Sequence, residues 1–219
     1  MAKQKTKAKA VLKETTNSFK KKAEKAIAEQ LNSALRKNKP RVENRLRGLI
    51  PGWIKASPEI ASLNSEGVQG SLNAQFGLYP GQAAAATTAI IEGIIASVDV
   101  RVKPLSTKLN IRSIVEFTVQ PVTYANLLAI PEGIVVQETN GKVLPWLDWL
   151  LNLGNTVIVA GYTYTPEGFG RSGGGTMNPG VGWRVPPQYA GVPGDNFISR
   201  ALANKEKEIV PILRDMFNV

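Results

Sequence analysis

Residues 168–173 (GFGRSG) formally match G-x-G-x-x-G, the spacing of a dinucleotide-binding turn. Such a turn must open a helix whose N-terminus faces the pyrophosphate. Here Gly174, Gly175 and Pro179 follow, so no helix is expected, and the segment lacks the lysine of a phosphate-binding P-loop. The glycines therefore predict an irregular inter-subunit or lumen-facing loop over residues 166–182.

Side chains suited to catalysis are scarce. The sequence has no His and no Cys, which excludes imidazole bases, thiol nucleophiles, disulfides and the usual zinc sites. The carboxylates form no paired signature, because Asp148 lies between two tryptophans and Asp195 is placed to cap a helix. A histidine-free hydrolase stays open as an alternative. The residues favour a protein that is not an enzyme and that uses no cofactor or metal.

Aromatic side chains could stack on nucleic-acid bases, and the chain has four tryptophans. Three of them belong to amphipathic stripes, which favours anchoring roles in the core. The tryptophans are Trp53, Trp146, Trp149 and Trp183.

Positive charge is concentrated at the N-terminus. The net charge is +10, and residues 1–48 hold 15 Lys and Arg against 4 Asp and Glu, whereas the remaining residues hold 12 against 13. A neutral body with a basic arm differs from a basic DNA-binding fold, because only the arm can follow phosphates. We expect residues 1–18 to form a flexible basic arm, which serves either as a solubilising tail or as a contact for DNA or a partner protein. The lysines expected to make such contacts are Lys3, Lys5, Lys7, Lys9, Lys20, Lys21 and Lys22.

The sequence shows no membrane signal. No stretch approaches the ~18 apolar residues of a membrane span, and the lysine-rich start lacks the apolar core of a signal peptide. We therefore expect a soluble protein that is made in a cytoplasm and has no membrane partner.

An apolar stripe of helical period begins at Phe19 and continues after an interruption at Asn38-Lys39-Pro40. This pattern predicts two helices in line or one helix kinked at Pro40. Such a long amphipathic element packs on its own sheet or on neighbouring copies. The members of the stripe are Phe19, Ala23, Ile27, Leu31, Leu35, Val42, Leu46, Leu49 and Trp53.

Helices and then strands follow this stripe. Ser57-Pro58-Glu59 is a helix start, and the Ala- and Ile-rich run 82–97 predicts a buried helix. The period then switches to alternation, which predicts an antiparallel pair of strands over residues 98–103 and 111–119. Asn140-Gly141 suits the turn of a further hairpin.

In the remaining sequence a helix begins at Pro145 and ends at Gly154, and the strand 156–165 follows. A last helix is capped near Asp195 or Asn196 and is expected to continue toward Phe217 with a bend at Pro211. The mixture predicts an α+β fold: a long basic N-terminal helix on a small, mostly antiparallel sheet, with a long hairpin, an extended glycine-rich loop and a C-terminal helix. Residues 19–219 are expected to form one ring-forming domain.

The sequence contains a series of short motifs. Their order along the chain is a more specific signal of a protein family than any single motif. They are Ser57-Pro58-Glu59, Phe76-Gly77-Leu78, Pro145-Trp146-Leu147-Asp148-Trp149-Leu150, Gly170-Arg171-Ser172-Gly173, Trp183-Arg184-Val185-Pro186-Pro187, Tyr189-Ala190-Gly191 and Asp195-Asn196-Phe197-Ile198-Ser199-Arg200-Ala201-Leu202. The series covers roughly residues 57–202 and resembles virion proteins of tailed bacteriophages with contractile tails. More distantly, the chain resembles the tail-completion proteins of the phage neck.

The resemblance implies a structural function: a homo-oligomeric ring, six- or twelve-fold, at the head-to-tail junction around the DNA channel. The ring would be of the tail-completion, terminator or stopper type. It implies portal or adaptor proteins and tail tube or terminator proteins as partners, nonspecific contact with channel DNA, and a place in the virion after assembly in the host cytoplasm. The alternative is a DNA-binding packaging accessory that acts through the basic N-terminal segment. The candidates for subunit contacts or loops are Phe19, Ile27, Leu31, Asn140, Gly141, Gly170, Arg171, Ser172, Gly173 and Trp183.

Overall fold

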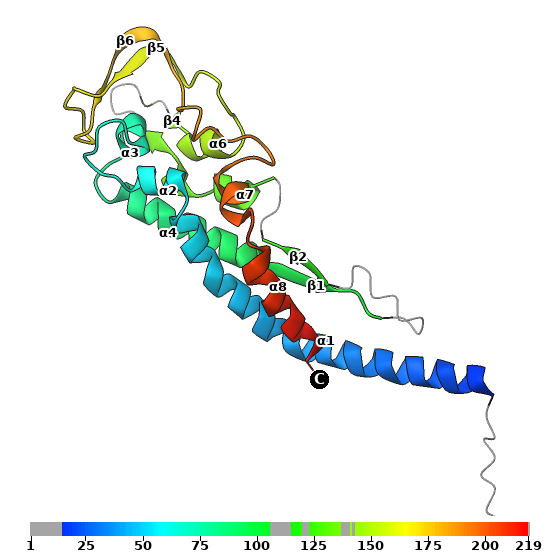
Figure 1. The fold of residues 1–219 in the computed structure, drawn as a ribbon. Coiled ribbons are helices and arrows are strands. Elements are labelled where there is room, and N and C mark those ends of the chain that lie inside the picture. The colour runs from blue at the N-terminus through cyan, green and yellow to red at the C-terminus, as the bar shows by residue number, and fades with distance from the viewer. Residues whose placement is uncertain (1–14, 106–114, 120–122, 137–140, 142, 219) are drawn as a thin grey trace, which may run out of the picture.

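The fold is known from a computed structural model, which describes residues 15–105, 115–119, 123–136, 141 and 143–218. The described part mixes helices with small antiparallel sheets, so the predicted α+β class is confirmed. Figure 1 shows a long helix along one side of an elongated body, with most other elements gathered at one end of that helix.

The long helix is α1, Thr16–Lys55 (40 residues), and it is continuous. Thr15 caps it by accepting a hydrogen bond from the Ser18 N–H. Pro40 and Pro51 both lie inside it, and Figure 1 shows that the helix bends partway along. Of the two predicted arrangements, two helices in line is wrong. The helix also begins at Thr16, inside the segment expected to be a flexible arm.

Three helices follow, and each starts or stops on a residue suited to that place. Helix α2 is Pro58–Leu63, helix α3 is Leu72–Phe76, and helix α4 is Gln82–Ser97. The hydroxyls of Ser57 and Ser71 cap α2 and α3, and Gly77 ends α3 in the left-handed conformation (φ 63°). The predicted helix starts at Ser57 and Gln82 are confirmed.

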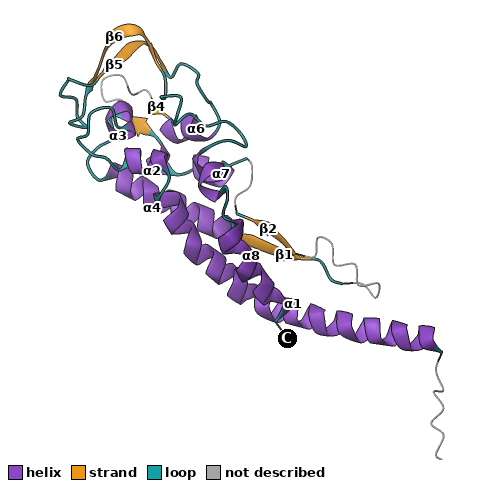
Figure 2. Cartoon of the chain, viewed as in Figure 1, coloured by secondary structure: helices purple, strands orange, loops and turns teal. Residues whose placement is uncertain are grey.

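The strands pair as three separate two-stranded antiparallel sheets among the described residues, so the expectation of one small sheet is wrong. Strand β1 (Asp99–Val102) pairs with β2 (Val115–Thr118), β3 (Val135–Val136) with β4 (Val143–Leu144), and β5 (Val159–Thr165) with β6 (Thr176–Trp183). In Figure 2 these short ribbons lie at different places around the helices. Each ribbon is too small to close a core alone, and helices supply the rest.

Two predicted features of the second half are wrong in part. Residues 176–182, expected to be irregular, form strand β6, because glycines at 180 and 182 permit close approach to β5. The last helix is divided into α7 (Phe197–Leu202) and α8 (Glu206–Arg214), followed by the short helix η2 (Asp215–Phe217). The break falls at Asn204, which has a positive φ of 61°, and Pro211 lies inside α8.

The remaining short elements are α5 (Ala125–Leu128), η1 (Pro131–Gly133) and α6 (Trp146–Leu151). Elements α5 and η1 pack against α4, α6 packs against both of them, and together they complete the larger of two buried clusters, whose centre holds Phe76 between Trp146 and Trp183. The smaller cluster joins the middle of α1 to α8 and β1. The body is therefore built around the second half of α1, and its first turns are left outside.

Candidate functional site

The first three turns of α1 project from the body and carry apolar side chains that the described residues do not bury. We call residues 16–27 the projecting segment. The exposed fraction of Phe19 is 62% and that of Ile27 is 46%, whereas Leu35 is fully buried. Figure 1 shows this segment, in dark blue, extending away from the other helices. Among the residues that the structure describes, the buried positions of α1 begin at Ala28, so the stripe is left uncovered at Phe19 and Ile27.

The projecting segment is also basic. Lys20, Lys21, Lys22 and Lys25 all lie on it and are exposed, and its only acid is Glu24. Lys20 pairs with Glu24 at 4.0 Å and Lys25 with Glu29, one turn further on, at 3.8 Å, but exposed pairs of this kind contribute little stability. The segment thus presents apolar side chains flanked by cations to solvent.

The second half of α1 is held firmly, which gives the projecting segment a rigid base. Val42, Leu46 and Ile50 have no exposed surface. Arg45 forms an ion pair and hydrogen bond with Asp215 of η2, and the Asn38 amide donates to the Asn218 carbonyl at 2.7 Å. The direction in which the projecting segment points is therefore set by the body.

The glycine-rich loop between β5 and β6 is held against α3 by its own side chains. Arg171 donates to the Gly77 carbonyl and to the Tyr79 hydroxyl (3.1 Å), and its guanidinium lies 4.6 Å from the Tyr79 ring centre. Ser172 donates to the Ala74 carbonyl at 3.4 Å. No helix follows the G-x-G-x-x-G match, as predicted, because residues 176–183 form strand β6.

Glycine is required by crowding at two places in this loop. A Cβ on Gly170 would lie 2.2 Å from the Gly175 carbonyl oxygen, and one on Gly174 would lie 2.7 Å from the Ala74 side chain. The loop therefore packs closely on itself and on α3. It still presents Phe169, which is 99% exposed.

The tryptophans act as core anchors, as the amphipathic stripes predict. Trp183, a candidate contact residue, is 5% exposed, and its indole N–H donates to Gln75 at 3.1 Å. Its ring meets Phe76 edge-on, with ring centres 5.6 Å apart. Trp146 is fully buried on the other side of Phe76.

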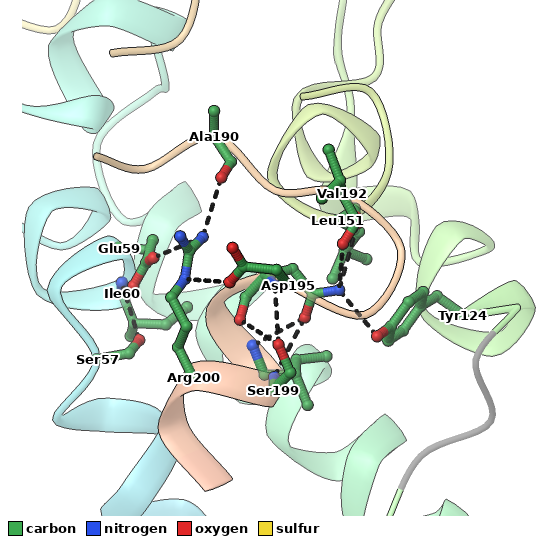
Figure 3. Close-up of polar contacts among 12 residues, drawn as sticks. Ser57, Glu59, Ile60, Tyr124, Leu151, Ala190, Val192, Asp195, Ser199 and Arg200 are labelled. Carbon is green, nitrogen blue, oxygen red and sulfur yellow. Dashed lines mark hydrogen bonds and ion pairs between the residues drawn. The ribbon is translucent and has the colours of Figure 1, made fainter. Parts of the chain in front are cut away.

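A polar cluster joins α2 to α7 and is drawn in Figure 3. Arg200 of α7 forms an ion pair with Glu59 of α2 at 3.2 Å, donates to the Ala190 carbonyl at 3.0 Å, and lies 3.7 Å from Asp195. Glu59 is 2% exposed, and its second carboxylate oxygen has no hydrogen-bond partner among the described residues. Burial raises the pKa of the Glu59 carboxyl above its ordinary value of 4.5, and the backbone hydrogen bond and Arg200 offset part of this rise.

Asn196 forms the second part of this cluster and is fully buried. Its side-chain oxygen Oδ1 accepts hydrogen bonds from the backbone N–H groups of Ile198 and Ser199. This contact caps α7, as the sequence predicts. Its amide donates to the Tyr124 hydroxyl at 2.8 Å and to the Leu151 carbonyl at 3.3 Å. Figure 3 shows Tyr124 and Leu151, which accept from this amide, on one side of the cluster, and Glu59, the ion-pair partner of Arg200, on the other.

A pocket of about 350 Å³ opens beside this cluster. Trp53, Pro58 and Ala201 supply apolar walls, and Arg200 and Lys205 supply cations that already pair with Glu59 and Glu208. The described residues contain no group of three or more acidic side chains placed to hold a metal ion. None of the described helices is long and apolar enough to cross a bilayer.

The candidate residues lie in separate places. Phe19, Ile27 and the partly exposed Leu31 share α1 with Lys20, Lys21 and Lys22, whereas Gly170 to Gly173 lie on α3 at the other end of the body. Gly141 has a positive φ of 66° and lies between β3 and β4, whose antiparallel pairing confirms the predicted hairpin. The predictions for Lys3, Lys5, Lys7, Lys9 and Asn140 concern positions outside the described residues.

Sequence reasoning missed the pairing of Glu59 with Arg200. Both residues belong to the motif series, and the structure brings that series together: Arg171 contacts Gly77, Trp183 contacts Phe76, and Arg200 contacts Glu59. No periodic pattern links positions so far apart in sequence. Only the buried acid directly after a helix cap could have drawn attention to Glu59.

Comparisons with protein-family models, with curated proteins and with solved structures gave no match.

Proposed function

We propose that the protein is a structural virion protein of the neck of a tailed phage with a contractile tail. It is a head-to-tail connector of the tail-completion, terminator or stopper type. In this proposal identical copies form a six- or twelve-fold ring around the DNA channel and join the portal side to the tail. Its neighbours are portal or adaptor proteins and tail tube or terminator proteins.

The observation that carries the assembly part of this proposal is the projecting segment of α1. The side chains of Phe19 and Ile27 are exposed to water. Burying a side chain of this size stabilises a fold or an interface by about 1.5–3 kcal/mol. A rigid helix that holds such side chains outside its own body is typical of a subunit that completes its core in an assembly. The resemblance of the motif series supplies the kind of assembly.

Acidic protein surfaces are the proposed partners of the basic N-terminus. The projecting segment carries apolar side chains as well as lysines, and phosphates offer no surface for the apolar side chains. Tight phosphate binding around a channel would also hinder passage of DNA. Contact with channel DNA is therefore weak and nonspecific in this proposal.

Two measurements test the proposed function. Sedimentation velocity of the full chain is expected to show a closed oligomer, and averaged images of phage particles are expected to place the chain at the neck. A chain that remains monomeric and is absent from particles would end the proposal.

A DNA-binding packaging accessory is the second candidate, because α1 carries eleven Lys and Arg against three Glu. Filter binding at two salt concentrations distinguishes the two. A specific affinity that falls steeply with salt, and that is lost on deletion of residues 1–25, would favour the accessory. Since α1 begins at Thr16, a variant with Lys20, Lys21 and Lys22 changed to Gln serves as a control that keeps the helix.

A further inference from the structure

We infer that the projecting segment docks on the outer face of α4 in a second copy of this chain. This inference rests on the proposed function, which requires contacts between copies, and it names the two surfaces. The outer face of α4 is the row of exposed residues Ala84, Thr88, Glu92 and Ala96, with Ala85 beside it.

The two helix faces match in shape. The row on α4 consists of small side chains around one acid, spaced every four residues, so the backbone is open to a close approach. The apolar residues Phe19, Ala23 and Ile27 are spaced every four residues as well, and two of them are large. Ridges spaced every four residues on both helices pack into each other's grooves at a crossing angle of about −50°.

The two faces also match in charge. The sequence from residue 56 to residue 100 contains no Lys or Arg, and the outer face of α4 carries Glu92. Glu132 lies in η1, which packs on α4. The projecting segment supplies Lys20, which follows Phe19 and lies beside its apolar row at 100° per residue. A lysine beside large apolar side chains thus meets a face of small side chains whose charged residue is an acid, which favours this pair over a pairing of two projecting segments, where lysines would oppose lysines.

The contact must form between copies. Within one chain Arg47 of α1 donates to the Val98 carbonyl at the end of α4, at 3.2 Å. Phe19 precedes Arg47 along the same helix by about 40 Å at 1.5 Å per residue, so it cannot reach its own α4. Figure 1 shows the projecting segment directed away from α4.

The contact joins two different surfaces, so it is heterologous. An open series of copies keeps one unused projecting segment at one end and one unused α4 face at the other, and both are used when the ring closes. The ring of the proposed function therefore needs no second kind of interface between its subunits.

Disulfide trapping tests the contact, since the chain has no cysteine to interfere. The full-length double variant Ala23→Cys with Thr88→Cys is oxidised and examined on a non-reducing gel. We expect a ladder of covalent oligomers from this variant. The control, Ala23→Cys with Val181→Cys, exposes its second thiol on β6 (Val181 is 98% exposed) and is expected to stay monomeric on the gel.

Charge reversal provides the second readout. Lys20→Glu and Glu92→Lys are each expected to weaken association on the order of tenfold, and the double variant to regain most of it. Both positions are exposed, so circular dichroism should show unchanged folding. An oligomer that forms without the 23–88 ladder would overturn the contact and leave the ring proposal standing. A chain that is monomeric in solution would overturn the contact, and its presence or absence in particles would then decide the proposed function separately.

Discussion

Arg200 on α7 pairs with Glu59 on α2, a carboxylate that is 2% exposed, at 3.2 Å between guanidinium nitrogen and carboxylate oxygen. The pair fastens the C-terminal helices to the segment that follows α1. It thereby fixes the base from which the projecting segment extends.

Replacing Arg200 should destabilise the fold without unfolding α1 itself. Arg200→Met leaves Glu59 buried without its cation, and we expect a loss of about 2–4 kcal/mol in the free energy of unfolding. Arg200→Lys keeps a cation and should lose less. Urea unfolding followed by circular dichroism measures both, and equal losses would show that the charge pair does not matter.

The buried acid should make stability depend on pH. Because burial raises the pKa of Glu59, the folded state holds this proton more tightly than the unfolded chain does. The free energy of unfolding should therefore fall as pH rises from about 4.5 through the raised pKa, and level off above it. Urea unfolding across this range checks the slope, which Glu59→Gln should flatten.

Asp99 should affect the pH dependence of stability in the opposite direction to Glu59. Its hydrogen bond from Arg101 lowers its pKa below 3.8, with a smaller effect of Lys39. This stabilisation is present above pH 3.8 and is lost as pH falls through the lowered pKa. The free energy of unfolding of Asp99→Asn should differ from that of the unchanged protein at neutral pH and match it at low pH. A difference confined to low pH would contradict the lowered pKa of Asp99.

Two glycines should respond to alanine in opposite ways. A Cβ on Gly191 would lie 1.8 Å from the Leu150 carbonyl oxygen, so Gly191→Ala should lower the melting temperature by many degrees. Gly48, inside α1, has nothing within 4 Å, and Gly48→Ala should stabilise the chain by about 0.5–1 kcal/mol. Thermal unfolding of both variants checks the signs.

The apolar stripe of α1 should divide into two functional parts. Leu35→Ala removes a fully buried side chain and should cost about 2–5 kcal/mol of stability. Ile27→Ser alters a side chain that is 46% exposed, so it should leave monomer stability nearly unchanged and weaken self-association. Thermal unfolding and sedimentation of the two variants separate these effects. A large loss of stability in Ile27→Ser would mean that the body covers the stripe.

Local patterns predicted elements well where one residue type decides the conformation. Ser57 and Asn196 cap helices because their side-chain oxygens reach free N–H groups, and alternation of Val98 to Val102 marked a strand. The same patterns could not show how many sheets the strands form, because pairing depends on tertiary contacts. Strand β6 was not predicted, because its glycines give no alternating apolar pattern. These glycines allow β6 to lie close to its partner strand.

The stripe on α1 was visible in the sequence, but its partner was not. Helical periodicity shows that Phe19 and Leu35 lie on one face, and it cannot show that the body ends between them. For the same reason the outer face of α4, built of small residues, had no signal. It becomes a candidate surface only once the side chains of Phe19 and Ile27 are seen to be exposed.

The most direct test of the account is to locate the chain in intact phage particles by averaging images of particles that carry a labelled copy. The account predicts label in a closed ring at the junction of head and tail, with neighbouring subunits joined through α1 and α4. Particles without the chain, or a chain placed as isolated single copies, would contradict it.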